Sequence, residues 1–270
     1  MGRLDSILIV GCGNMGGAML RGWLAGGAAA AHFTVVDPLL DSVPEGVTLL
    51  RQLPDAGFDA ILLGVKPQGF AEVAAGLAPR VSDTTLVLSI LAGIDLPSLA
   101  KALPQARGWV RVMPNLAAAL GKSPVALAQH GLDQAGQDQV MALLAPLGTP
   151  EWIAEAQFDL ATALVGSGPA FVYRFIDALA AGGAALGFSA EQAERFALAM
   201  VEGAAELARQ SLHSPAALAQ MVSSPGGTTE AGLKVLDREQ ALEKLVSATL
   251  RAASDRGAEL AAFATSPKDD

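Results

Sequence analysis

The sequence predicts an α/β domain with a parallel-rich sheet, followed by an all-α domain. Short apolar runs alternate with helical segments in the first half, and a glycine-rich turn joins the first run to the first helix. From about residue 158 onward the pattern is helical, with no convincing strand. We therefore divide the chain into domains at 1–155 and 156–270.

The strands of the first domain are expected where apolar, β-branched residues cluster. The runs are SILIV (6–10), HFTVVD (32–37), GVTLL (46–50), AILLGV (60–65), TLVLSI (85–90) and GWVRVMP (108–114). Helices are expected over 15–26, 70–78 and 96–103. Continuous apolar strands joined by helical crossovers indicate a parallel sheet that is covered on both faces.

The second domain is expected to contain helices only. Their predicted ranges are 158–187, 189–211, 214–222, 227–236 and 238–263. The sequence SAEQ at 189–192 has the pattern of a capping box. Pro169 removes a helix hydrogen bond within the first range, so we expect a kink or a fresh helix start there.

Composition and charge exclude several function classes. With 18 basic and 27 acidic residues the net charge is −9, which argues against nucleic acid as a partner. Cys12 is the single cysteine, so no internal disulfide can form, and we expect a cytoplasmic protein. The sequence offers no membrane span and no metal site: its long apolar stretches contain breakers, and its three histidines are isolated.

The segment ILIVGCGNMGGAM carries G-x-G-x-x-G between a strand and a helix. Gly11 permits the tight turn, Gly13 lets the backbone approach a diphosphate, and Gly16 allows close helix–strand packing. The helix start supplies free N–H groups. We interpret the segment as a Rossmann-like dinucleotide site whose contacts also include Cys12, Asn14 and Met15, although a plain glycine-rich turn would look similar.

Asp37 ends the next strand, about 20 residues after the glycines. An acid there can accept hydrogen bonds from the adenosine ribose and would repel a 2′-phosphate, so it favours NADH. A turn-forming Asp-Pro pair is the alternative. Arg51 follows the next strand and leaves NADPH open.

Three further strand ends are candidates for cofactor contacts. They occur in GVKPQ, SILAGI and RVMPN, where ligands lie in sheets of this kind. Solvated strand ends or strand-to-loop junctions would look alike. The candidate residues are Val65, Lys66, Pro67, Ala92, Gly93 and Asn115.

Together, GCGNMG, GVKPQ, SILAGI, RVMPN, GSGPAF and SPGGTT resemble the pyrroline-5-carboxylate reductase family, in family order over nearly the whole chain. The resemblance implies reduction of 1-pyrroline-5-carboxylate to L-proline by hydride transfer from NAD(P)H, a step of proline biosynthesis. It also implies a helical domain that forms a homodimer, with larger rings of dimers common. The sequence departs from the family pattern at Asp37, at Leu116 after Asn115, at Val165, and at Arg256-Gly257.

The segment SPGGTT is a candidate binding site for the substrate carboxylate. Pro225 breaks the preceding helix, while Gly226 and Gly227 expose backbone N–H groups beside the next helix start. The resemblance assigns the catalytic hydroxyl, facing the imine nitrogen, to Thr229. It assigns further substrate contacts to Ser224 and Thr228. A helix N-cap with a glycine turn is the structural alternative.

Other functions remain open at this point. One alternative is a related reductase that acts on another imine. A β-hydroxy-acid enzyme would need a lysine base on a C-terminal helix, and none occurs between Phe158 and Val222. A dinucleotide-binding regulator without catalysis is a third possibility, but the hydroxyls of SPGGTT, which such a protein could lose, are present.

Overall fold

The computed structural model describes residues 4–265, with side chains described through residue 259. Backbone contacts divide the chain into two compact units. The sheet unit contains the residues up to Ser167 together with those from Ala252 onward, and the helical unit is Gly168–Arg251. The predicted domain boundary at residue 155 stays a prediction.

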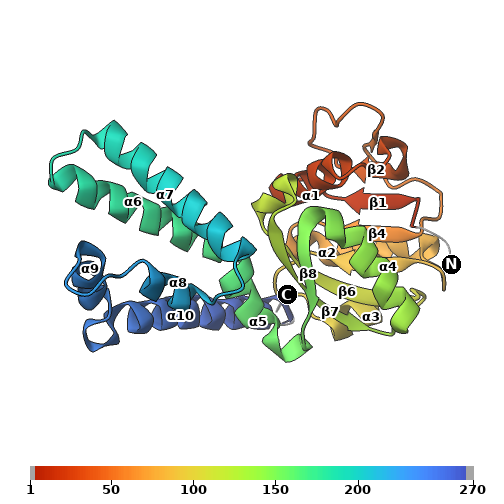
Figure 1. Ribbon diagram of the computed structural model, residues 1–270. Coiled ribbons are helices and arrows are strands. Elements are labelled where there is room, and N and C mark those ends of the chain that lie inside the picture. The colour runs from red at the N-terminus through yellow and green to blue at the C-terminus, as the bar shows by residue number, and fades with distance from the viewer. Residues whose placement is uncertain (1–3, 266–270) are drawn as a thin grey trace. The chain divides into compact units, whose positions relative to one another are not determined.

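The sheet unit is built around one sheet, which within residues 4–265 has eight strands in the order β3-β2-β1-β4-β5-β6-β7-β8 (Figure 1). The strands are β1 (Ile7–Val10), β2 (Phe33–Val36), β3 (Thr48–Leu50), β4 (Ala60–Leu63), β5 (Leu86–Ser89), β6 (Gly108–Met113), β7 (Ser123–His130) and β8 (Gly148–Trp152). Ile7 of the central strand β1 pairs in parallel with Phe33 on one side and Ala60 on the other. The carboxyl ends of β1 to β6 therefore share one edge of the sheet.

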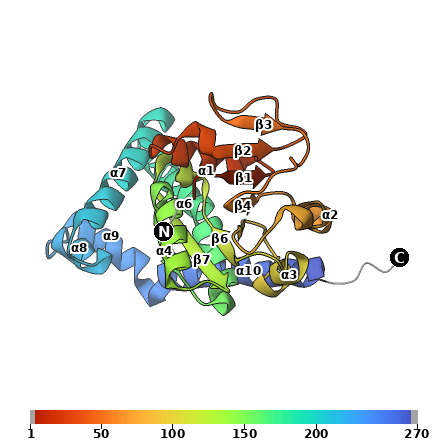
Figure 2. The same ribbon diagram turned by 90° about the vertical axis from the view of Figure 1, so that its right-hand side faces the viewer.

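Alternate residues of each strand enter two separate cores, one on each face of the sheet. In β1, Ile7 and Ile9 belong to one core, and Leu8 and Val10 to the other. The helices α1 (Asn14–Ala25) and α4 (Gln134–Leu144) cover the first face. The second face packs against α2 (Phe70–Leu77) and α3 (Leu96–Ala102). Figure 2 shows the edge strand β3, followed by β2 and β1. The predicted fold class is confirmed.

Two strands and one helix lie where the sequence predicted none. Strands β7 and β8 follow β6, and α4 lies between them. Strand β7 runs antiparallel to β6, which is the one antiparallel pair of the described sheet. These strands escaped prediction because Pro124 and Pro150 lie inside them; proline removes a ladder hydrogen bond and reads as a loop signal.

The helix expected over 158–187 is divided in two. Helix α5 (Phe158–Ala161) continues into a π-helical turn at Thr162–Gly166, where the Ser167 N–H donates to the Thr162 carbonyl at 3.0 Å. Helix α6 (Gly168–Ala185) then begins afresh, as the proline in GSGPAF predicted.

The helical unit contains the other predicted helices. They are α7 (Ala190–Gln210), α8 (Pro215–Met221), α9 (Thr228–Leu236) and α10 (Ala241–Thr265), which extends beyond this unit. The capping box is confirmed, since Ser189 and Gln192 each accept the other's backbone N–H at 3.2 Å. The last predicted helix starts late because Glu239 and Gln240 adopt left-handed backbone, with φ of 52° and 60°.

Candidate functional site

The turn between β1 and α1 brings two backbone segments into direct contact. Gly11 has φ of +83°, and a side chain there would place its first carbon 2.8 Å from the Gly64 carbonyl carbon. At Gly16 that carbon would lie 2.9 Å from the Gly11 carbonyl oxygen. Both positions therefore require glycine for packing, as the sequence predicted for a tight turn and a close helix.

Gly13 differs from its neighbours because the space beside it is open. A carbon built on Gly13 meets no atom of the described residues within 4 Å. Gly13 is the N-cap residue of α1, and no side chain caps the helix there. The N–H groups of Asn14, Met15 and Gly16 have no carbonyl of the helix to donate to. This open cradle fits a diphosphate, which helix starts bind through N–H groups.

A cleft of about 900 Å³ opens beside this turn, lined by residues that follow β1, β2, β3 and β4. Among its lining residues are Gly11, Cys12, Gly13, Asp37, Arg51, Val65, Lys66 and Arg80. The structure thus brings together most candidates from GCGNMG, the β2 end and GVKPQ. Pro67 begins a short 3-10 turn next to Lys66 and is absent from the cleft lining.

Asp37 organises the loop after β2 through both of its carboxylate oxygens. Oδ2 accepts the Cys12 N–H and Oδ1 accepts the Leu39 N–H, each at 2.9 Å. Arg51 Nη1 donates to the Asp37 carbonyl at 3.1 Å and to the Leu40 carbonyl. Asp37 therefore has the turn role that the sequence left as an alternative, and it still lines the cleft.

The Cys12 thiol is buried in the glycine turn and is chemically quiet. Burial, together with the negative charge of Asp37, raises its pKa from 9.0 to about 11. The thiol is accordingly protonated at neutral pH and is a poor nucleophile. The Cys12 side chain fills space within the glycine turn. Its backbone N–H donates to Asp37 and so joins this turn to the loop after β2.

Two further strand ends lie along the same sheet edge. The turn after β5 contains Ala92, which is exposed, and Gly93, which has φ of +77°. Asn115, just after β6, is buried and uses its side chain internally. Its Oδ1 accepts the Ala117 N–H at 2.9 Å, and its Nδ2 donates to the Val165 carbonyl at 3.1 Å. Its contact with a cofactor stays a prediction.

SPGGTT forms a tight turn at the start of α9, in the helical unit. The Gly227 N–H donates to the Ser224 carbonyl at 2.9 Å, and Gly226 has φ of +73°. Proline followed by a left-handed glycine is the pattern of a type II turn. Thr228 and Thr229 are exposed at the first two positions of α9.

The expectation that Gly226 and Gly227 offer free N–H groups is wrong. The Gly227 N–H closes the turn, and the Gly226 N–H donates to Glu230 Oε2 at 2.6 Å. Glu230, which the sequence analysis missed, also forms an ion pair with Lys234 at 3.0 Å. The Gly226 N–H and Lys234 lower the Glu230 pKa. The donors still available for an anion are the N–H groups of the first turn of α9.

The described residues contain neither a metal cluster nor a membrane-spanning helix. Among them, no group of three or more His, Cys, Asp or Glu side chains is arranged to hold a metal ion. No helix in that part of the chain is long and apolar enough to cross a membrane.

Two family models match the chain. The model described as pyrroline-5-carboxylate reductase dimerisation matches residues 155–260. A model described as coenzyme F420-dependent NADP oxidoreductase matches residues 6–93. The dimerisation model covers the SPGGTT turn, and the oxidoreductase model covers the GCGNMG turn.

Known proteins resemble the chain over nearly its full length. A pyrroline-5-carboxylate reductase from Pseudomonas aeruginosa is 38% identical over 264 residues, which cover 94% of this chain and 96% of that protein. The structure of such a reductase from Coxiella burnetii has a TM-score of 0.88 at 30% identity, over 96% of this chain and 99% of the other. A Plasmodium falciparum pyrroline carboxylate reductase with NADP bound has a TM-score of 0.82 at 23% identity, over 96% and 100%, which shows a shared fold.

Proposed function

The chain belongs to the pyrroline-5-carboxylate reductase family and is an NAD(P)H-dependent reductase of 1-pyrroline-5-carboxylate, and from this premise we propose which residues hold the cofactor and the imine. The reaction makes L-proline and so completes a biosynthetic route to that amino acid. The observation that carries the assignment of the cofactor site is the open cradle at Gly13, next to a cleft of about 900 Å³.

The cofactor diphosphate binds at the start of α1. The N–H groups of Asn14, Met15 and Gly16 point out of the helix end there and complement negative charge without a basic side chain. Asp37 lies at the rim of the same cleft, where its charge favours the ribose hydroxyls of NADH and repels a 2′-phosphate. Lys66, Ala92, Gly93 and Asn115 extend the cofactor path along the sheet edge.

The substrate carboxylate binds at the start of α9. The N–H groups of Thr228 and Thr229 lie in the first turn of this helix, where the helix dipole is positive. With the Gly226 and Gly227 N–H groups already engaged, these two residues replace the glycines as the proposed donors. The type II turn at Ser224 holds the helix start in position.

When bound, the nicotinamide supplies the hydride that adds to the C=N carbon of the imine. The protein's part is to hold the imine by its carboxylate and to orient the ring. The Thr229 hydroxyl donates a hydrogen bond to the ring nitrogen as that atom becomes an amine. An iminium that arrives protonated needs no strong acid, which agrees with an exposed threonine in this place.

The decisive assay is oxidation of NADH and of NADPH, side by side, in the presence of 1-pyrroline-5-carboxylate. We expect turnover with both cofactors and a higher kcat/KM with NADH. Absence of turnover with either cofactor contradicts the assigned reaction. A higher kcat/KM with NADPH contradicts only the role given to Asp37.

Thr229→Ala tests the catalytic hydroxyl. We expect kcat to fall by about 10- to 100-fold, because a hydrogen bond formed in the transition state is lost. The Kd for NADH, measured by fluorescence titration, is expected to stay within about twofold, since Thr229 does not belong to the cofactor cleft. Thr229→Ser, which keeps the hydroxyl, is the matched control and should retain most activity. Equal kcat in wild type and Thr229→Ala removes the residue from the mechanism.

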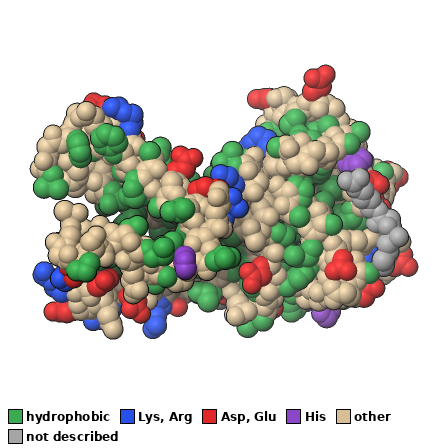
Figure 3. All heavy atoms as spheres, viewed as in Figure 1, with side chains coloured by type: hydrophobic (Ala, Val, Ile, Leu, Met, Phe, Trp, Pro, Cys, Tyr) green, Lys and Arg blue, Asp and Glu red, His purple; other side chains and the backbone are tan. Residues whose placement is uncertain are grey.

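The helical unit carries the surface for assembly. Among its described residues the buried side chains are Ala193 and Ala197, both in α7, which is a very small core. Figure 3 shows many hydrophobic side chains on its surface. The exposed ones include Val172, Tyr173, Phe175, Leu179, Phe196, Leu198, Met200, Leu207, Leu245 and Val246. Such a surface fits the dimerisation family that matches residues 155–260.

We propose that these homodimers can join into a larger ring and that the enzyme is cytoplasmic. A chain with a single cysteine needs no oxidising compartment. Sedimentation velocity of the purified protein distinguishes a dimer from a larger ring, and imaging of a tagged chain in its own cell tests the location.

A further inference from the structure

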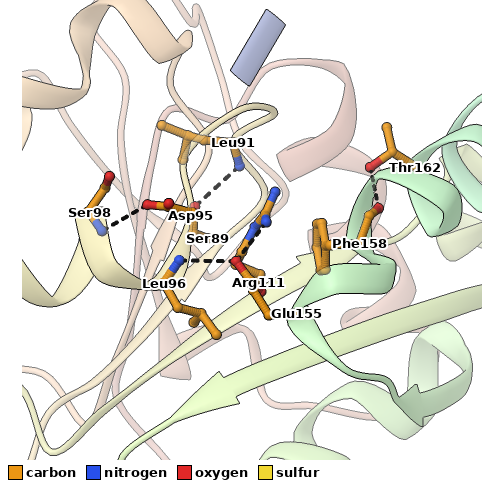
Figure 4. A network of polar contacts seen from close by, with 9 residues as sticks. All are labelled: Ser89, Leu91, Asp95, Leu96, Ser98, Arg111, Glu155, Phe158 and Thr162. Atoms are coloured by element: carbon orange, nitrogen blue, oxygen red, sulfur yellow. Dashed lines mark hydrogen bonds and ion pairs between the residues drawn. The ribbon is translucent and has the colours of Figure 1, made fainter. Parts of the chain in front are cut away.

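We propose that Arg111 and Glu155 are positioning residues that fix the turn after β5, where the cofactor is expected to bind. Figure 4 shows the network to which they belong. Arg111 is a charged residue of β6, yet its exposed fraction is only 6%. Its Nη1 forms an ion pair with Glu155 Oε1 at 2.8 Å. Its guanidinium also lies 3.7 Å from the centre of the Phe158 ring.

The same oxygen of Glu155 reaches a third element. Oε1 accepts the Leu96 N–H at 3.2 Å, and Leu96 is the first residue of α3. Asp95, the N-cap residue of α3, accepts the Ser98 N–H at 2.9 Å and so fixes the helix start. Glu155 therefore holds the beginning of α3 against β6.

The turn that contains Ala92 and Gly93 is fixed at both of its ends. At its start, Ser89 Oγ accepts the Leu91 N–H at 3.3 Å. At its end lies Leu96, held by Glu155. Movement of Glu155 would release the second end and let the exposed Ala92 shift.

The residue Asn115, just beyond the carboxyl end of β6, is tied to the same stretch of chain. Asn115 donates to the Val165 carbonyl in the π-helical turn. The segment 155–165 is thus joined to the β6 region at two places, by Arg111 through Glu155 and by Asn115. The ends of β5 and β6, two of the strand ends that we assign to the cofactor path, are therefore set by this one segment.

A stabilising role alone does not account for the pair. Glu155 Oε2 is buried and, within the described residues, has no hydrogen-bond partner. An unpaired carboxylate oxygen is unfavourable, and well-packed apolar side chains often replace buried ion pairs without loss of stability. What an apolar pair cannot supply is the acceptor for the Leu96 N–H. That acceptor is the function we assign to Glu155, and Arg111 holds it in place.

The inference rests on the proposed cofactor role of the 92–93 turn, and the test separates the two. The variants are Glu155→Gln, Arg111→Met, the double variant Arg111→Met/Glu155→Met, and Ala92→Ile. Val112→Ala, in the same strand but in the core of the opposite face, is the control for loss of stability alone. For each, kcat, the KM for the cofactor, the KM for 1-pyrroline-5-carboxylate and the thermal midpoint are measured on the full chain.

We expect each single variant of the pair to lower the thermal midpoint, because it leaves a buried partner uncompensated. The double variant regains most of that midpoint. Its KM for the cofactor stays raised by about fivefold and its kcat stays lowered by about tenfold, because the turn is no longer held. Val112→Ala loses stability and keeps wild-type kinetic constants. If the single variants do not fold, the comparison of the double variant with wild type tests the positioning role by itself.

A double variant with both wild-type stability and wild-type kinetic constants overturns the inference. If Ala92→Ile leaves the KM for the cofactor unchanged, the turn does not contact the cofactor and the proposed site is wrong. If Ala92→Ile raises that KM while the double variant does not, the site stands and the positioning role is refuted.

Discussion

Replacing Asp37 by serine is the sharpest test of cofactor choice in this enzyme. Asp37 lies at the end of β2, lines the cleft, and carries a negative charge close to where an adenosine ribose would bind. Serine keeps a small polar group and removes the charge. The change therefore acts on the electrostatic term that separates NADPH from NADH.

The size of the effect follows from the position of the carboxylate. Two unit charges 4 Å apart interact by about 1 kcal/mol in water and about 4 kcal/mol at an effective dielectric of 20. Asp37 is half-buried at an open rim, so an intermediate value of about 2 kcal/mol applies to its repulsion of a 2′-phosphate. Removing it should raise kcat/KM for NADPH by about 30-fold.

Use of NADH should change in the opposite direction. Loss of a hydrogen bond to the ribose costs about 1 kcal/mol, or about fivefold in kcat/KM. The loop is affected too, because the Cys12 and Leu39 N–H groups lose their acceptors. Asp37→Asn serves as the control, since it removes the charge and keeps an acceptor for one of these groups.

The assay is the initial rate of cofactor oxidation at 340 nm over a range of NADH and NADPH concentrations, at fixed imine. The quantity compared is the ratio of the two kcat/KM values in wild type, Asp37→Ser and Asp37→Asn. Asp37→Ser should shift the ratio toward NADPH by about 150-fold, the product of the two effects, and Asp37→Asn should shift it in the same direction. An unchanged ratio would mean that Asp37 acts only within its own loop.

Two further predictions concern stability. Because the Cys12 pKa is raised from 9.0 to about 11, the folded state keeps its thiol proton between these values while the unfolded state loses it. Between these pH values the free energy of unfolding should therefore fall as pH rises, by about 1.4 kcal/mol per pH unit more in wild type than in Cys12→Ala. Urea unfolding at pH 8.5, 9.5 and 10.5 measures this dependence. Equal slopes of unfolding free energy against pH in the two proteins would disprove it. Glu239 has φ of 52°, so Glu239→Gly should raise the free energy of unfolding by about 0.5–1 kcal/mol, whereas Asp237→Gly, at φ of −88°, should lower it. A lower thermal midpoint for Glu239→Gly would show that other contacts decide its conformation.

The elements that follow simple periodicity could be read from the sequence. Helices expected at 70–78 and 96–103 lie within one residue of α2 and α3. Strands β1 to β6 were found because each is a short apolar run after a turn signal. Strand β8 could not be found in this way, because GTPEW alternates half-buried and exposed residues at the sheet edge and contains a proline.

The packing roles of Gly11 and Gly16 were predictable because each of these glycines meets a local requirement of the backbone. Hydrogen bonds between residues distant in sequence were not. Nothing in the sequence pairs Glu155 with Arg111 and Leu96, which belong to other elements. Glu230 is different, since an acid three residues after the N-cap position is a known capping pattern, and the sequence carried that signal.

Because the core of the helical unit is sparse, we expect the stability of the enzyme to depend on its concentration. We expect a unit whose buried side chains, among the described residues, are two alanines to gain stability from burial against another copy. By mass action, dilution shifts such a protein toward chains that are incompletely folded. We therefore expect chains without a partner to be degraded by proteases faster than assembled ones.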